Sequence, residues 1–182
     1  FISVRKGVRF MQRQNIDSGN AFDWGKTSQD YGKFRDIYPP LFYQKIVERN
    51  CGTAGQEVLD IGTGTGVLPR NMYRFGAHWT GIDIAPNQIA EAKRLSAGME
   101  ISYLVSPAEE LDFAGKQFDC ITACQCYWYF DNQKAAPVFA RLLKPHGELL
   151  LLCMEWLPYS DKIAEASEKL VLQYNPKWSG AG

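Results

Sequence analysis

Apolar residues along the chain recur with two different periods. Short apolar runs, typical of strands buried on both faces, alternate with segments in which apolar residues have helical spacing. The expected strands cover residues 58–61, 78–84, 100–105, 118–124 and 147–154, and the expected helices cover 41–49, 67–75, 87–95, 135–143 and 162–174. Alternating strands and helices predict an α/β fold, a doubly wound, mostly parallel Rossmann-like sheet with helices on both faces.

The first predicted strand runs into three glycines at alternate positions, Gly62, Gly64 and Gly66. Glycine tolerates positive φ and lets a ligand approach the bare backbone. The helix predicted next offers unpaired N–H groups at its first turn. Strand, glycine turn and helix together are the first half of a nucleotide-binding βαβ unit.

Asp60 precedes the first glycine by two residues and decides which nucleotide fits. A carboxylate at this strand tip would repel the pyrophosphate of a dinucleotide. It would attract a ligand with a cationic end, such as the sulfonium and ammonium groups of S-adenosyl-L-methionine (SAM). The glycine spacing, G-x-G-x-G, also differs from the dinucleotide fingerprint G-x-G-x-x-G. The motif therefore favours SAM over NAD.

The segment from Val58 to Gly66 resembles the glycine-rich first motif of the class I SAM-dependent methyltransferases, which has the form acidic-x-G-x-G-x-G. The resemblance extends over about residues 22–156, and four signals carry it in order along the chain: Asp60 with its glycines, Asp83, Ala108-Glu109, and Gln125 with the aromatics after it. It implies SAM as the cofactor and in-line transfer of its methyl group to an acceptor.

Asp83 ends the second predicted strand, where an acid is placed to accept hydrogen bonds from two ribose hydroxyls; the alternative is a helix N-cap or surface acid. In the resembling family, Ile84 would pack on the adenine, and Gln88 would reach the ribose or stay exposed. That family often has Asp-Ala-Glu after the third strand, but Pro107 replaces the acid here. The Ala108 N–H remains as a donor to the adenine, and Glu109 would supply the carboxylate.

Tyr31 and Arg35 match a segment that forms a partial lid over the cofactor in this family. They are four residues apart, hence on one face of a helix, and would offer a hydroxyl and a guanidinium to the methionine carboxylate. The alternative is that Tyr31 packs and Arg35 faces water. The complete set of predicted cofactor-binding residues is Tyr31, Arg35, Asp60, Gly62, Thr63, Gly64, Asp83, Ile84, Gln88, Ala108, Glu109 and Gln125.

Gln125 corresponds to the family position beside the transferable methyl group. Tyr127, Trp128 and Trp156 are the predicted substrate pocket, which suits an apolar or aromatic small molecule and attracts the sulfonium by cation–π contact; the alternative is that these rings are core packing. His78 and His146 fall at the wrong end of the sheet for a general base, and no catalytic base is assigned.

Charge and cysteine content limit the partners. Lys+Arg and Asp+Glu both number 20, which argues against a generic nucleic-acid binder. No apolar run is long enough to span a membrane. Five cysteines, an odd count without a regular framework, are expected to be reduced thiols in a cytoplasmic protein. Cys120, Cys124 and Cys126 are expected to be small buried hydrophobes, and no metal site is predicted.

We expect one SAM-binding methyltransferase domain over residues 1–182, with an N-terminal helical lid segment (1–50), a nucleotide-binding core (51–156) and a C-terminal helix (157–182). The absence of an initiator Met and the stop after a helix suggest that both ends are incomplete, with the family's sixth and seventh strands missing. Two alternatives are a nucleotide-dependent oxidoreductase and a non-catalytic SAM-binding protein. The acceptor atom and the oligomeric state are left open.

Overall fold

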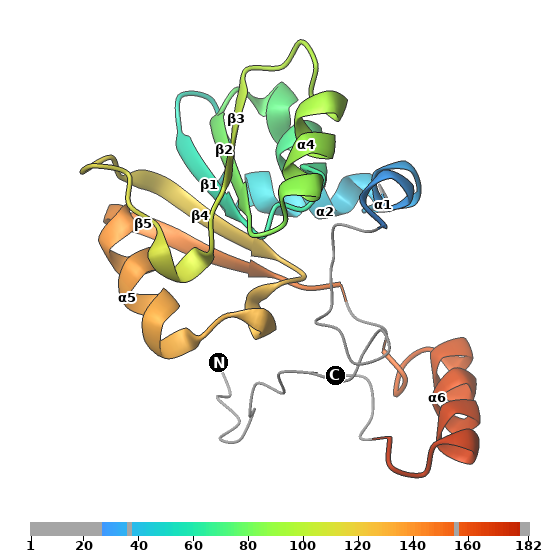
Figure 1. Ribbon diagram of the computed structural model, residues 1–182. Coiled ribbons are helices and arrows are strands. Elements are labelled where there is room, and N and C mark those ends of the chain that lie inside the picture. The colour runs from blue at the N-terminus through green and yellow to red at the C-terminus, as the bar shows by residue number, and fades with distance from the viewer. Residues whose placement is uncertain (1–26, 36–37, 155–156, 179–182) are drawn as a thin grey trace. The chain divides into compact units, whose positions relative to one another are not determined.

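The computed structural model describes residues 27–35, 38–154 and 157–178. The chain divides into two compact units, Phe1–Leu152 and Cys153–Gly182, and each is described by itself. The first unit contains a five-stranded sheet with its helices, and the second contains α6 (Lys162–Tyr174) (Figure 1).

All five strands run parallel, in the order β3-β2-β1-β4-β5. Their bounds are β1 (Glu57–Ile61), β2 (His78–Asp83), β3 (Ile101–Val105), β4 (Phe118–Cys124) and β5 (Leu143–Leu152). The central strand β1 buries Val58, Leu59 and Ile61 completely, because helices cover both faces of the sheet. The predicted Rossmann-like α/β sheet is confirmed.

The helices of this unit are α1 (Ser28–Phe34), α2 (Pro40–Glu48), α3 (Val67–Met72), α4 (Pro86–Leu95) and α5 (Asn132–Leu142). Short 3-10 helices cover Tyr73–Phe75, Ala108–Glu110 and Tyr127–Tyr129. Both α2 and α4 start at a proline, whose fixed φ suits the first helical position. These bounds follow the predicted helices closely.

Each face of the sheet has its own core. Phe139 of α5 packs with Leu59 and Ile121 on one face. Met72 of α3 packs with Val58, Trp79 and the rest of the second core on the other face, where α2 also contributes. On that same side α4 packs on β3, and α1 packs on α4 (Figure 1).

The fifth strand begins earlier than predicted, at Leu143 rather than Gly147. Leu143 pairs with Phe118 and Glu148 pairs with Cys120, with a shift of register between them. His146 lies in this irregular stretch with a φ of 69°. The segment that the sequence predicts as a turn is therefore part of β5.

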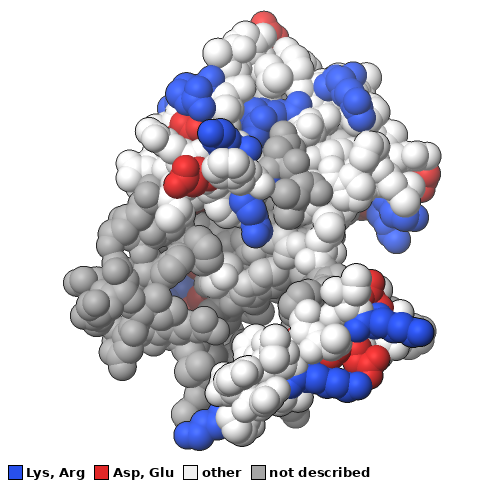
Figure 2. Space-filling model, turned by 90° about the vertical axis from the view of Figure 1, so that its right-hand side faces the viewer, with Lys and Arg blue, Asp and Glu red and all other residues white. Residues whose placement is uncertain are grey.

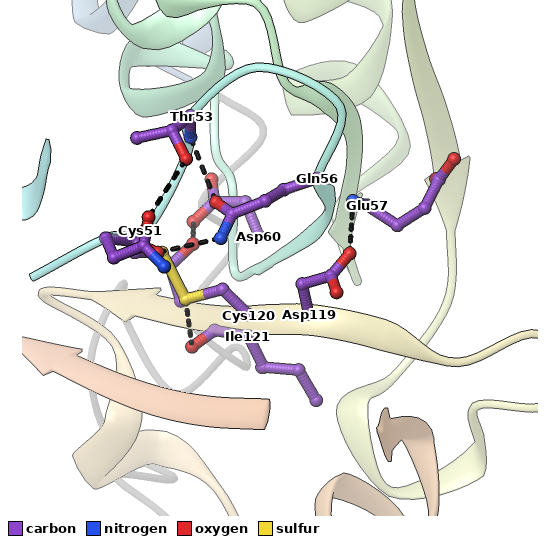
Figure 3. The surroundings of a disulfide bond; sticks show 10 residues. Cys51, Thr53, Gln56, Glu57, Asp60, Asp119, Cys120 and Ile121 are labelled. Carbon is purple, nitrogen blue, oxygen red and sulfur yellow. Dashed lines mark hydrogen bonds between the residues drawn. A yellow bond between two sulfur atoms is a disulfide. The ribbon is translucent and has the colours of Figure 1, made fainter. Parts of the chain in front are cut away.

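Cys51 and Cys120 form a disulfide, so the expectation that all five cysteines are reduced thiols is wrong for this pair (Figure 3). Cys51 follows α2 and Cys120 lies on β4, with their Cα atoms 6.0 Å apart, which a disulfide spans without distortion of the backbone. The bond is buried among the residues of the second core. Cys124, Cys126 and Cys153 are outside the disulfide.

A carboxylate joins three strands where they start. Asp119 accepts a hydrogen bond from the backbone N–H of Glu57 at 2.8 Å (Figure 3). The Lys144 ammonium donates to both Asp119 oxygens, at 2.9 and 2.8 Å. Hydrogen bonds from Lys144 and Glu57 hold the pKa of Asp119 below its usual value. Asp119 thus joins the beginnings of β1, β4 and β5.

The second unit is built around α6, whose bounds are those that the sequence predicts. The Asp161 carboxylate caps the helix by accepting from the N–H groups of Ile163 and Ala164, at 2.8 and 2.9 Å. The Trp178 indole N–H donates to Glu168 at 2.8 Å, which folds the end of the described chain back onto the helix.

Basic and acidic side chains are interspersed among uncharged ones on the face shown in Figure 2, in keeping with the equal counts of the two signs. None of the helices in the described ranges combines the length and the apolar character needed to cross a bilayer. The predicted pocket residue Trp156 lies outside the described residues.

Candidate functional site

The three glycines after β1 form a loop whose backbone conformation is unfavourable for residues other than glycine. Gly62, Gly64 and Gly66 have φ of 66°, 55° and 75°, the left-handed region that glycine favours. A Cβ on Gly62 would lie 2.7 Å from the Cys126 sulfur, too close for real atoms. A Cβ on Gly64 would meet only Tyr31 and Gln88, at 3.9 and 4.0 Å. Gly64 therefore exposes bare backbone to open space.

That space is a cavity of about 490 Å³ at the carboxyl ends of the strands. Open α/β sheets bind ligands at this edge, and the volume is within the usual range for ligand sites. The lining residues come from α1 and its C-cap, from α4, and from the ends of β1, β2, β3 and β4 with the segments that follow them: Tyr31, Arg35, Ile61, Gly62, Gly64, Ile82, Asp83, Ile84, Gln88, Ser106, Pro107, Ala108, Glu109, Cys124, Gln125, Cys126, Trp128, Tyr129 and Phe130.

Asp83, at the tip of β2, joins its strand to the glycine loop. One carboxylate oxygen accepts from the N–H of Gly64 and the other from the N–H of Ala85, both at 2.9 Å. Burial raises the pKa of Asp83, and these backbone N–H groups oppose the rise. A carboxylate oxygen accepts more than one hydrogen bond, so Asp83 keeps capacity for ligand hydroxyls.

Asp60, a predicted cofactor-binding residue, lies outside the cavity lining. It is buried, it accepts a 2.7 Å hydrogen bond from the Thr122 hydroxyl, and it is not among the residues that line the cavity. Burial raises the pKa of Asp60 to about 7, with the Asp83 charge adding to the rise. Its negative charge is thus partial at neutral pH. Thr63 is also buried and outside the lining.

The first helix covers one side of the cavity. The Arg35 guanidinium lies over the Tyr31 ring, 5.0 Å from its centroid, and both line the cavity as the predicted lid residues. Gly32 allows α1 to lie close against α4: a Cβ there would be 3.0 Å from both Glu91 and Leu95. The segment after α1 is also fixed to the sheet, because the Cys124 thiol donates to the Tyr38 hydroxyl at 3.4 Å.

Residues after β3 form a second wall. Ser106, Pro107, Ala108 and Glu109 line the cavity, and one Glu109 oxygen accepts from the N–H of Asp131 at 2.9 Å. Asp131 is in turn the N-cap of α5, since its carboxylate accepts from the Gln133 N–H at 3.1 Å. Part of the Glu109 carboxylate is therefore already used to hold the start of α5.

The wall after β4 is mostly apolar. Gln125 stands there with a φ of 59°, between Cys124 and Cys126. Burial raises the pKa of the Cys124 thiol to about 12 and also raises that of Cys126, so both thiols are neutral. Tyr127 is not in the cavity lining; its ring packs edge-on to Phe130 at 6.0 Å, on the side of the core that α5 covers.

The methyltransferase domain family matches residues 59–151 of the chain. The chain belongs to this family. The predicted likeness to class I SAM-dependent methyltransferases is thereby confirmed.

Among relatives of this methyltransferase domain, the ubiquinone biosynthesis O-methyltransferase of Salmonella arizonae is 32% identical over 178 residues, which are 91% of this chain and 73% of the relative. The enzyme of the same name from Salmonella paratyphi A is 32% identical over 154 residues. That match covers 80% of this chain but 63% of the relative, so the chain spans under two thirds of the length of that protein.

The fold is also that of a SAM-dependent methyltransferase from Geobacter sulfurreducens, solved in complex with S-adenosyl-L-homocysteine (SAH). The two structures agree with a TM-score of 0.58 and 21% sequence identity, over 71% of this chain and 55% of that one.

Most of the predicted site residues of the methyltransferase domain lie together around one cavity, although their roles in binding stay predictions. Asp60, Thr63 and Tyr127 lie outside the lining. The predicted set did not include the lining residues Ile61, Ile82, Ser106, Pro107, Cys124, Cys126, Tyr129 and Phe130. Their position at the end of a predicted parallel strand, or within six residues after it, was the available signal, because such strand ends meet at one edge of the sheet.

Proposed function

We propose that the chain binds SAM in this cavity and transfers its methyl group to a small-molecule acceptor. The observation that carries the proposal is Gly64: its bare backbone faces the cavity, and its N–H is held by the Asp83 carboxylate at 2.9 Å. This arrangement supports the proposal, because the two Asp83 oxygens would accept from ribose hydroxyls beside a surface that a nucleoside can approach closely.

The other lining residues fit the remaining parts of SAM. Arg35 and Tyr31 would pair with the methionine carboxylate, since a guanidinium binds a carboxylate by charge-assisted hydrogen bonds. Ile84 and Ala108, which line the cavity beside Asp83, offer apolar surface to the adenine. Asp60 lies behind the glycine loop, and its ionised form would be favoured by a bound cation.

Bound SAM would supply an activated methyl group, because breaking the bond between the methyl group and the positively charged sulfur releases a neutral thioether, which is a good leaving group. The side chains of the chain would bind and orient the two reactants and exclude water from the space between them. Trp128 and Tyr129 offer ring faces, to which a cation is attracted. None of these contributions requires a general base.

Two further observations support the proposal. The Salmonella relatives are named as O-methyltransferases of ubiquinone biosynthesis, a small-molecule pathway. The Geobacter structure holds SAH, the product that methyl transfer leaves behind.

Titration of the chain with SAM, SAH and NADH by calorimetry tests the cofactor assignment. We expect SAM and SAH to bind and NADH not to bind. Asp83→Ala should weaken SAM binding about 10- to 100-fold, the scale of losing hydrogen bonds to a charged group. Binding of NADH in place of SAM would instead indicate a nucleotide-dependent oxidoreductase.

Transfer of a labelled methyl group from SAM to a broad panel of small acceptors tests the reaction. A labelled product is expected from at least one acceptor. Tight SAM binding without transfer to any member of the panel would contradict the proposed activity and indicate a non-catalytic SAM-binding protein.

The cytoplasmic location predicted from the cysteines stays a prediction. The Cys51–Cys120 disulfide weighs against it, since disulfides persist mainly in oxidising compartments.

A further inference from the structure

Glu109 joins two walls of the cavity that come from distant parts of the chain. It lies in the 3-10 helix Ala108–Glu110 after β3, is half-buried, and lines the cavity. One oxygen of its carboxylate accepts from the backbone N–H of Asp131 at 2.9 Å, across a sequence separation of 22 residues. This hydrogen bond connects the wall after β3 to the segment between β4 and α5.

Asp131 stands where the aromatic part of the cavity ends and α5 begins. Residues 128–130, called the aromatic wall below, line the cavity directly before it. The Asp131 carbonyl accepts from the N–H of Ala135 at 2.8 Å, in the first turn of α5. The Phe130 ring packs edge-on to Phe139 of the same helix, with 6.0 Å between the ring centroids. A displacement of Asp131 would therefore displace the aromatic wall and the start of α5 together.

The turn that carries Glu109 is short, and a contact from the cavity would restrict it. Its Glu110 N–H donates to the Pro107 carbonyl at 3.3 Å, slightly longer than most N–H···O hydrogen bonds. The residue after the turn is tied to the other end of α5, since the Arg141 guanidinium donates to the Leu111 carbonyl at 2.7 Å. The segment after β3 thus contacts both ends of α5.

We propose that Glu109 is a positioning residue that couples the two walls. A nucleoside bound against Ala108 and Glu109 restricts the 3-10 turn and stabilises the hydrogen bond to Asp131. This in turn orders the aromatic wall, which the methyl acceptor contacts. The inference rests on the proposed function, because it requires the nucleoside of SAM to lie against the wall after β3.

The coupling depends on the reach of the Glu109 side chain and not on its charge. A backbone N–H donates to an amide oxygen as well as to a carboxylate oxygen, so a glutamine of the same length keeps the connection. An aspartate keeps the charge but is one methylene shorter, so its oxygens do not reach the Asp131 N–H.

Amide hydrogen exchange, followed by NMR with and without saturating SAH, tests the coupling. The Phe130 amide reports on the aromatic wall, and the Ala135 amide reports on the first turn of α5. We expect SAH to slow exchange at both amides by about 5-fold or more, the lower end of the usual coupling between sites. Leu59, in the buried centre of β1, is the reference amide, because a bound ligand stabilises the whole fold in every variant.

Four variants separate reach from charge. In Glu109→Asp, and in Glu109→Ala, which removes the acceptor altogether, the effect of SAH at Phe130 and Ala135 should fall to within about twofold. Glu109→Gln should keep the effect seen in the wild type. Glu110→Ala is the matched control and should also keep it, because Glu110 belongs to the same turn but is exposed and outside the cavity lining.

Failure of the wild-type chain to bind SAH in the calorimeter would overturn the proposed function. SAH binding that leaves exchange at Phe130 and Ala135 unchanged would overturn this inference alone. Two further results would do the same: slowing that survives in Glu109→Ala, and slowing that is lost in Glu109→Gln.

Discussion

Asp60 shows how burial changes the meaning of a charged residue. Its carboxylate is 2% exposed and its pKa is about 7, against 3.8 for a free aspartate side chain. The sequence presents it as a fixed negative charge at the tip of β1. In the fold it is a group whose charge depends on pH near neutrality.

The proton on the Asp60 carboxyl group should make the free energy of unfolding depend on pH. The folded chain holds it up to about pH 7, whereas the unfolded chain releases it near pH 4, so the contribution of Asp60 to stability falls as pH rises between these values. Between pH 5 and pH 8, the free energy of unfolding of the wild type should therefore fall by an amount on the order of 2–4 kcal/mol that the Asp60→Asn variant does not show. Urea unfolding at pH 5 and pH 8 measures it, and an equal pH dependence in the variant and the wild type would contradict the assigned pKa.

Substitution by alanine should lower stability more at Gly62 than at Gly64, although both glycines belong to one loop. Gly62→Ala should cost about 2–5 kcal/mol, from the positive φ and from overpacking against the Cys126 sulfur, 2.7 Å from the added Cβ. Gly64→Ala has only the backbone strain, about 1–2 kcal/mol, because the added Cβ meets open space.

Thermal unfolding and SAM titration of both variants check this pair. We expect Gly64→Ala to stay folded but to bind SAM poorly, since its methyl group occupies the cavity. Equal losses of stability in the two variants would contradict the described packing of Gly62.

At the level of single residues, the sequence predicts which residues stand at strand ends but not the direction in which a side chain points. Asp83, Ala108 and Gln125 all lie at the predicted edge, because a parallel sheet brings its strand ends together. The 3-10 helix Tyr127–Tyr129 decides which aromatics reach the cavity, with Tyr129 in the lining and Tyr127 outside it. Hydrophobicity alone does not distinguish them.

At the level of elements, periodicity predicted all five strands and the helices α2 to α6 to within a few residues. The register shift in β5 could not be predicted, because it depends on how Leu143 and Glu148 pair with a strand distant in sequence. The role of Asp119 is of the same kind, since its partners Glu57 and Lys144 come from two other strands.

Asp119→Ala should destabilise the start of β1. The Glu57 N–H would lose its acceptor, and the expected cost is about 1–3 kcal/mol for a hydrogen bond to a charged group. Hydrogen exchange at the Glu57 amide should accelerate in this variant more than exchange at Leu59, the buried centre of β1. Lys144→Ala, which leaves the Glu57 hydrogen bond in place, is the control and should change exchange at Glu57 less.

At the level of the whole molecule, the Cys51–Cys120 disulfide closes a loop across a sequence separation of 69 residues. Five cysteines allow many pairings, so the sequence could not show which two meet. Their proximity results from the packing of the segment after α2 against β4, which is a property of the complete core.

Reduction of this disulfide should lower the free energy of unfolding by about 4 kcal/mol, the value that loop-closure entropy gives for a loop of this length. Denaturant unfolding with and without a reductant measures the difference. A Cys51→Ala, Cys120→Ala double variant should be insensitive to the reductant, whereas Cys153→Ser, which changes an exposed thiol outside the disulfide, should behave as the wild type does. A wild-type chain that is insensitive to reductant would contradict the bond.

The hydrogen bond from Gly64 to Asp83 changes how affinity measurements at this residue must be interpreted. The Asp83 carboxylate holds the loop and would also hold the proposed ligand, so a substitution at Asp83 disturbs both. The loss of affinity is then larger than the loss of the proposed ribose contact alone would cause. Trimming the ligand avoids this ambiguity. A 2′-deoxy analogue of SAH leaves the loop intact, so its affinity deficit isolates the sugar contact, and the excess seen with Asp83→Ala then measures how much binding depends on a preformed loop.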